Sequence, residues 1–328
     1  MMEKRFIAMV LVAILLIVSI IACGSTPEEQ PSAPDIEDSE IVADETEPSE
    51  EQLPTEPPSP EASEEVEISF YGISVVDPDE PGMFYSAEEG KHLVSIEVAI
   101  ENNSGEAISV NPLNTTLIDN QGLAYMPDLG SSENHDQIDT LDLFPGERIR
   151  GWISFKIEDG SSPSKIKYEL DMWTGEVVEA DLTQTIAMPE WSLFTPVLQF
   201  PGLGETSSVA GYSLSALSVV DPSQPGILYT PEEGLRLISI EIMVRNESGA
   251  ESLSVNPLYA YLVDNIGFIY AVELGSSDLG QIDTLDLAAG EAAKGYVTFE
   301  VPQGNSALYV RYVTDFWGDA DPLVVGLR

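Results

Sequence analysis

The stretch Gln137-Ile138-Asp139-Thr140-Leu141-Asp142-Leu143 occurs twice in this chain, returning letter for letter as Gln281-Ile282-Asp283-Thr284-Leu285-Asp286-Leu287. The two occurrences stand 144 residues apart, and the same spacing relates Val76-Asp77-Pro78 to Val220-Asp221-Pro222. A length of 328 residues accommodates about two domains of ordinary size. We therefore expect two tandem copies of one domain.

Each copy carries strands in which apolar and polar residues alternate. In the first copy Ser95, Glu97, Ala99 and Glu101 are interleaved with Val94, Ile96, Val98 and Ile100. This period of two predicts a strand with one buried face and one solvated face. The second copy repeats the pattern with Ile238, Ile240, Ile242 and Val244.

Turn clusters rich in Asn, Asp and Gly separate these strands, and no run of ten residues beyond the leader has a helical period. The pattern predicts an all-β chain containing two antiparallel β-sandwiches of the immunoglobulin-like kind. We place the first copy at residues 67–187 and the second at residues 208–328.

The N-terminus reads as a lipoprotein signal peptide over residues 1–22. Lys4 and Arg5 precede the apolar run Phe6–Ile21, which is shorter than the roughly 20 residues that span a bilayer. Ile20-Ile21-Ala22-Cys23 resembles the bacterial lipobox, which implies that Cys23 becomes the new N-terminus and carries lipid on its sulfur. The alternatives are an ordinary cleaved signal peptide and a short membrane anchor.

Residues 23–66, which follow the signal peptide, are rich in Glu, Asp, Pro, Ser and Thr and contain no basic residue. Such a composition cannot bury a core, so we expect a disordered tether. The reach of residues 24–66 lies between roughly 35 Å as a flexible coil and about 130 Å as polyproline II. A passive spacer is the simpler interpretation, and an acidic tail that binds cations or a partner is the alternative.

The connector, residues 188–207, is apolar and punctuated by proline. It holds Trp191, Phe194 and Phe200 among Pro189, Pro196 and Pro201. We expect it to pack on one or both domains, and the alternative is an exposed aromatic patch for a partner.

Three motifs recur in both copies. They are an Asn-x-Ser-Gly turn at 102–105 and 246–249, an Asp-Asn-x-Gly turn at 119–122 and 264–267, and Gly-Glu-x-x-x-Gly-x-x-x-Phe at 146–155 and 290–299. This set resembles the immunoglobulin-like domain-of-unknown-function family of bacterial lipoproteins, which is similar to telokin-like domains and to a mycobacterial immunoprotective extracellular antigen. The resemblance implies the fold and an extracytoplasmic location, and it implies no activity.

Charge and composition limit the function. The formal net charge is −44, with 13 basic residues, so the surface would repel nucleic acid phosphates and anionic headgroups. Cys23 is the only cysteine, which leaves no thiolate metal site. A cation site could be sought at Asp77, Asp79 and Glu80 or at the repeated acids Asp139, Asp142, Asp283 and Asp286. The first set is mostly lost in the second copy, and the repeated acids fit solvated positions, so we expect no metal.

We also expect no enzyme and no cofactor. His92 corresponds to Arg236, His135 falls where the second copy is shorter, and no Gly-x-Ser-x-Gly elbow is present. The sequence favours a lipid-anchored binding or structural module on the extracytoplasmic face of the membrane, held through Cys23, with a protein or glycan partner. The alternatives are a hydrolase that uses carboxylates and a cation-responsive accessory subunit of an envelope complex.

Overall fold

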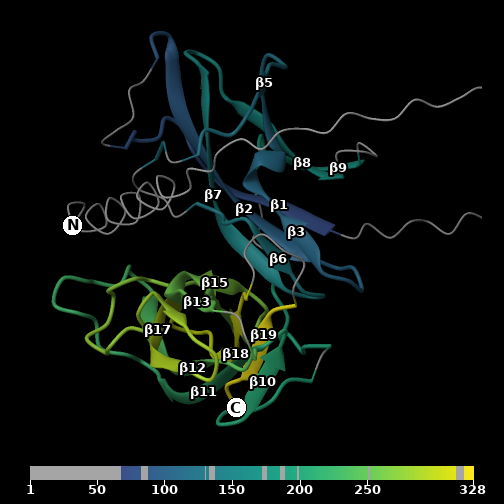
Figure 1. The fold of residues 1–328 in the computed structure, drawn as a ribbon. Coiled ribbons are helices and arrows are strands. Elements are labelled where there is room, and N and C mark those ends of the chain that lie inside the picture. The colour runs from purple at the N-terminus through teal and green to yellow at the C-terminus, as the bar shows by residue number, and fades with distance from the viewer. Residues whose placement is uncertain are drawn as a thin grey trace, which may run out of the picture. The chain divides into compact units, whose positions relative to one another are not determined.

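The computed structural model describes residues 68–82, 88–129, 131–132, 137–171, 176–184, 189–197, 199–249, 252–314 and 321–328 (Figure 1). The predicted signal peptide and tether, with Cys23, lie outside these ranges, and so does His135. All described residues belong to one compact unit, Val66–Arg328.

The first copy is built from two facing antiparallel sheets. One sheet has the order β1-β2-β7 and the other β5-β4-β8-β9, while β3 and β6 form a two-stranded ribbon. The strands are β1 (Ile68–Val76), β2 (Lys91–Asn102), β3 (Ile108–Val110), β4 (Thr115–Asp119), β5 (Ala124–Tyr125), β6 (Leu141–Leu143), β7 (Arg148–Glu158), β8 (Pro163–Asp171) and β9 (Glu176–Asp181).

The second copy repeats this arrangement and adds one strand. Its sheets have the orders β10-β11-β12-β17 and β15-β14-β18-β19, with β13 paired to β16, so β10 has no counterpart among the described strands of the first copy. The strands are β10 (Thr206–Val209), β11 (Tyr212–Val220), β12 (Leu235–Asn246), β13 (Leu253–Val255), β14 (Ala260–Asp264), β15 (Ile269–Ala271), β16 (Leu285–Leu287), β17 (Ala292–Pro302), β18 (Ala307–Tyr312) and β19 (Leu323–Gly326).

The predicted fold class is confirmed. Every strand pair is antiparallel, and the only helices in the described ranges are two single 3-10 turns, η1 (Pro112–Asn114) and η2 (Pro257–Tyr259). Three strands facing four in the first copy, and four facing four in the second, form sandwiches of the immunoglobulin-like kind. β10 begins at Thr206, inside the segment predicted as connector.

The predicted apolar faces form the cores. Val94, Ile96 and Val98 of β2 are fully buried, and so are Ile238, Ile240 and Ile242 of β12. Burying apolar surface of this kind is the main favourable term in folding.

The opposite face of β2 is less solvated than the alternation predicts. Ser95 and Ala99 were expected on the wet face, yet both are fully buried. The loop after β1 covers Ser95, because Asp79 N donates to Leu93 O at 2.8 Å and the Ser95 hydroxyl donates to the Asp79 carboxylate. Ala99 lies between the larger residues Tyr71 of β1 and Arg150 of β7. The loop position could not be read from the alternation itself.

The predicted Asp-Asn-x-Gly turns form with the expected chemistry. Asp119 accepts hydrogen bonds from the backbone of Gln121 and Leu123, each at 2.8 Å. Gly122 adopts a φ of 84°, a left-handed conformation that costs glycine little. The second copy repeats this turn around Asp264.

Candidate functional site

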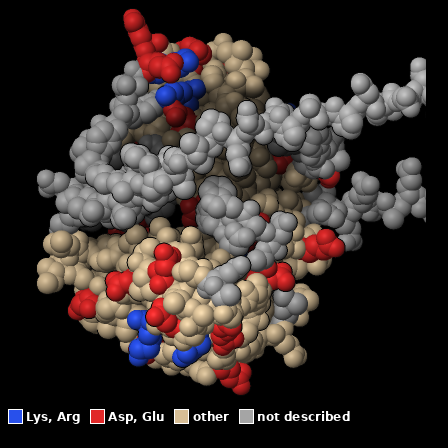
Figure 2. Space-filling model, viewed as in Figure 1, with Lys and Arg blue, Asp and Glu red and all other residues tan. Residues whose placement is uncertain are grey.

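The repeated acids are solvated side chains in the structure. Asp139, Asp142, Asp283 and Asp286 are all exposed, in strands β6 and β16 or just before them. Figure 2 shows acidic side chains scattered over the visible face of the molecule. In the described ranges, no three His, Cys, Asp or Glu side chains gather closely enough to hold a metal ion.

The acids after β1 each have a separate role. Asp77 meets His92, with 2.9 Å between Oδ1 and Nε2, whereas Asp79 is buried against Ser95. In the second copy Arg236 donates to Asp221 at 2.7 Å. Because a histidine in one copy and an arginine in the other pair with the same aspartate position, His92 fits a structural ion pair better than a catalytic base.

The feature that the sequence did not predict is a buried junction between the two copies. Every residue of β14 is buried. Ala260 and Leu262 point into the core of the second copy, whereas Tyr261 and Val263 belong to the core cluster of the first. A strand that is buried on both faces is covered on both sides, so the first copy packs on the outer face of the second copy's sheet.

A charged cluster lies inside this junction. Glu147 and Arg311 are 0% and 1% exposed, and Arg311 Nη1 lies 2.5 Å from Glu147 Oε2. Glu147 also accepts hydrogen bonds from the Tyr309 hydroxyl and from Phe144 N, the latter at 2.8 Å. Burial raises the pKa of Tyr309, and the adjacent Glu147 carboxylate raises that pKa further. The cluster satisfies a buried charge that would otherwise be costly.

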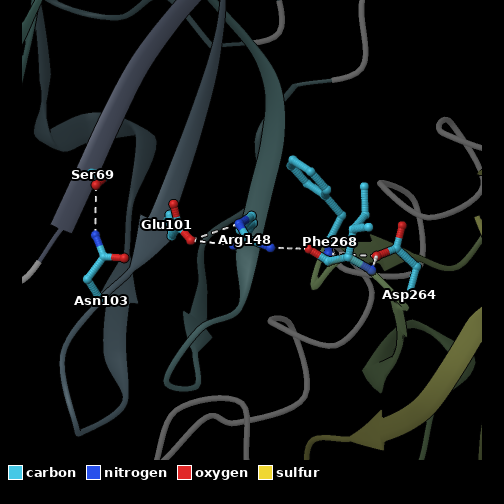
Figure 3. Close-up of polar contacts among 7 residues, drawn as sticks. Ser69, Glu101, Asn103, Arg148, Asp264 and Phe268 are labelled. Carbon is cyan, nitrogen blue, oxygen red and sulfur yellow. Dashed lines mark hydrogen bonds and ion pairs between the residues drawn. The ribbon is translucent and has the colours of Figure 1, made fainter. Parts of the chain in front are cut away.

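A second polar contact joins β7 to the turn after β14. Arg148 forms an ion pair with Glu101, with 2.9 Å between Nε and Oε1, and its guanidinium donates to Ile266 O (Figure 3). Arg148 N also donates to Gly267 O at 2.7 Å. Adding a Cβ at Gly267 would place it 2.9 Å from Gly146 O, so the two copies approach here to backbone contact.

The connector packs at the same junction, as predicted. The Trp191 ring makes edge contacts with Tyr71 of β1 and Phe268 of the second copy, with centroids 5.3 and 5.2 Å apart. Phe194 and Phe200 pack on Tyr309, at 6.4 and 4.9 Å. The connector aromatics therefore link the two sandwiches instead of forming an exposed patch.

Comparing equivalent positions of the two copies could have indicated this junction from the sequence. On the outer face of the second sheet, the first copy has Thr116, Lys165 and Lys167 where the second has Tyr261, Tyr309 and Arg311. Polar positions of one copy thus become large, buried positions of the other. Alternation within a single strand does not reveal such a change.

The comparisons with known proteins place the chain in a family. The model of the family described as "Domain of unknown function (DUF4352)" matches residues 64–178 and 201–322. A search of curated proteins finds no match.

Solved structures show weaker likeness. One is ycdA from Bacillus subtilis subsp. subtilis strain 168, described as a "putative lipoprotein": 14% identity over 38% of this chain and 39% of that one, with a TM-score of 0.31. Another is the yjhA protein from Bacillus subtilis, at 17% identity over 39% of this chain and 100% of that one, with a TM-score of 0.31. The match thus spans less than half the length of ycdA.

Proposed function

Because this chain belongs to the family described as "Domain of unknown function (DUF4352)" and contains two copies of its domain, we propose that it is a lipid-anchored extracytoplasmic module that displays two joined sandwiches. The observation that carries the proposal is the burial of β14 on both faces. The copies therefore act as one binding or structural body, whose partner is a protein or a glycan.

The N-terminal leader is the basis for proposing a lipid anchor. The apolar run before Cys23 and the resemblance to a lipobox support lipidation of that sulfur. One acyl chain holds a protein only marginally, whereas two or three hold it stably. Within the described ranges no helix is both long and apolar enough to cross a bilayer. With a tether reaching roughly 35–130 Å, the module would stand away from the membrane surface.

We propose further that the chain is not an enzyme. The repeated acids Asp139, Asp142, Asp283 and Asp286 are exposed and line no cleft in the described ranges. Asp264 is buried, which raises its pKa, but its oxygens accept hydrogen bonds from Ile266 N, Phe268 N and the Tyr270 hydroxyl within its own turn. Glu147 is also buried, and it is paired with Arg311 inside the junction. These features support a binding role over a carboxylate hydrolase.

Metabolic labelling tests the anchor. Labelled palmitate should appear on the wild-type chain and be lost from Cys23→Ser, because serine cannot form the thioether. Ser25→Ala, two residues away, is the matched control and should keep the label. Equal labelling of wild type and Cys23→Ser would overturn the lipid anchor.

A further inference from the structure

The second copy covers one side of its own sandwich with the segment 201–209. β10 within this segment pairs with β11, and upstream of β10 Gly204 N donates to Ala216 O at 2.8 Å. The same segment reaches the other sheet, because Gly326 N of β19 donates to Pro201 O at 2.7 Å. One extended segment therefore closes the groove between the edges of β11 and β19.

The corresponding edge of the first copy has no such strand in the described part of the chain. β1 is the last strand of its sheet, which has the order β1-β2-β7. Beside it, between β1 and β9, lies a hollow of about 260 Å³ whose lining includes Phe70, Gly72, Ala180 and Asp181. The groove that is filled in one copy is thus a hollow in the other.

The backbone direction of this edge follows from the second copy. Ala216, whose carbonyl accepts from Gly204, corresponds to Gly72 of β1. Because residues two apart in a strand direct their backbone groups to the same side, the N–H and C=O groups of Phe70 and Gly72 face the hollow. An edge of this kind is a template for an added strand.

The chain's own upstream residues are poorly suited to fill the groove. Gly204 donates a backbone hydrogen bond at a φ of 84°, and Pro60 stands at the corresponding position. Proline has no N–H and its φ is fixed near −65°. Residue 60 therefore cannot reproduce either property of Gly204.

The hairpin turn that returns β10 to β11 has the same difficulty. Ala210 and Gly211 form it with φ values of 48° and 86°. The corresponding residues are Val66 and Glu67, and a β-branched residue is strongly disfavoured at positive φ. The sequence ahead of the first copy therefore lacks the residues of the turn by which β10 covers the second copy.

The charges at this edge also disfavour the chain's own upstream segment as the occupant of the groove. β9 presents Glu179 and Asp181 where β19 has Val324 and Gly326. Lys165 pairs with Glu179 at 2.7 Å and also attracts Asp181, which lies opposite it in the neighbouring strand and accepts hydrogen bonds from Thr183 and Gln184. The upstream segment 57–65 contains three glutamates, so it would meet like charge at this edge. A second copy of the chain, also at −44, would be repelled as well.

We propose that the groove between β1 and β9 binds an extended, basic segment of a partner protein, which adds to β1 as an antiparallel strand. The backbone groups of Phe70 and Gly72 supply the pairing, and Asp181 selects positive charge. The inference deepens the proposed function, because it gives the display module a binding surface and a class of partner.

A peptide probe tests the groove on the full chain. The probe is a synthetic nonapeptide with the sequence of residues 201–209 in which lysine replaces Glu205, and the control peptide keeps the glutamate. Backbone hydrogen exchange should slow at Phe70 and Gly72 with the basic peptide and less with the acidic one. Asp181→Lys should reverse this preference, whereas Asp283→Lys, an exposed acid of the second copy, should not.

A graft tests the edge without any partner. Replacing residues 57–67 by the sequence of residues 201–211 should protect the Phe70 and Gly72 amides and abolish peptide binding. The proposal is overturned if these amides already exchange slowly in the wild type alone, if the graft leaves them unprotected, or if the basic peptide has no effect. Because the same results are expected in Cys23→Ser, they are distinguishable from a failure of the lipid anchor.

Discussion

Replacing Glu147 by alanine should weaken the junction between the two copies more than any surface change. The carboxylate is fully buried and receives Arg311 Nη1 at 2.5 Å, Phe144 N at 2.8 Å and the Tyr309 hydroxyl. Removing it leaves a buried guanidinium without its counter-charge. Breaking a buried ion pair in this way costs about 3–5 kcal/mol.

The structure favours the lower half of that range. Arg311 keeps a hydrogen bond from Nη2 to Asp142 O at 2.8 Å, and its guanidinium lies 4.6 Å from the centre of the Phe144 ring. These contacts still stabilise the Arg311 guanidinium after Glu147 is removed. We therefore expect a loss of about 3 kcal/mol in the free energy of unfolding.

The second copy provides the matched control. Glu291 occupies the position of Glu147 and accepts the same local hydrogen bond, from Ala288 N at 2.8 Å, but it is exposed. Glu291→Ala removes that bond without stranding a charge, so its cost should be about 0.5–1 kcal/mol. The comparison isolates the effect of burial at the junction.

Urea unfolding of both variants, followed by intrinsic fluorescence, gives the two free energies. Adding Arg311→Met to Glu147→Ala should recover part of the loss, because an apolar side chain replaces the stranded cation. Equal losses for Glu147→Ala and Glu291→Ala would refute the reasoning. No recovery in the double variant would show that the loss does not come from the uncompensated guanidinium.

Two further predictions concern the cores. Burial raises the pKa of Tyr261 to about 12, and it raises the pKa values of Tyr309 and Tyr312 as well. The neutral tyrosines therefore contribute fully to the free energy of unfolding below the unfolded pKa of about 10. This contribution is lost as the pH rises through the folded pKa values. A spectrophotometric titration should therefore show these tyrosines ionising late, together with alkaline unfolding, and a single unshifted titration of all tyrosines would contradict this. Ile240→Asp should cost more than about 4 kcal/mol, because it places an unpaired carboxylate in a fully buried position. Glu241→Gln, which affects only a surface pair with Lys294, should unfold nearly as the wild type does in the same denaturant titration, and similar losses from both variants would mean that the strand faces are misassigned.

Much of the fold could be predicted from local pattern. The alternation in β2 and β12 fixed which residues enter the cores, because a period of two assigns every second side chain to one face. The Asp119 turn followed from its own residues, since the aspartate and the glycine supply the hydrogen bonds and the positive φ within a few positions. Ser95 was misplaced because the loop after β1 folds back over it, and Ala99 because it lies between the larger residues Tyr71 and Arg150 of the neighbouring strands.

By itself the sequence determined the tandem duplication, the apolar faces of the strands, the acidic character and the resemblance of the leader to a lipoprotein signal. Each of these is a property of neighbouring residues or of direct repetition. Only the tertiary structure decided that Glu147 would meet Arg311, which lies 164 residues further along the chain. It also decided that β14 would be buried on both faces and that a hollow would lie between β1 and β9. Such features depend on which surfaces of a duplicated fold face each other, and packing between distant segments determines that choice, whereas the periodicity of one strand does not.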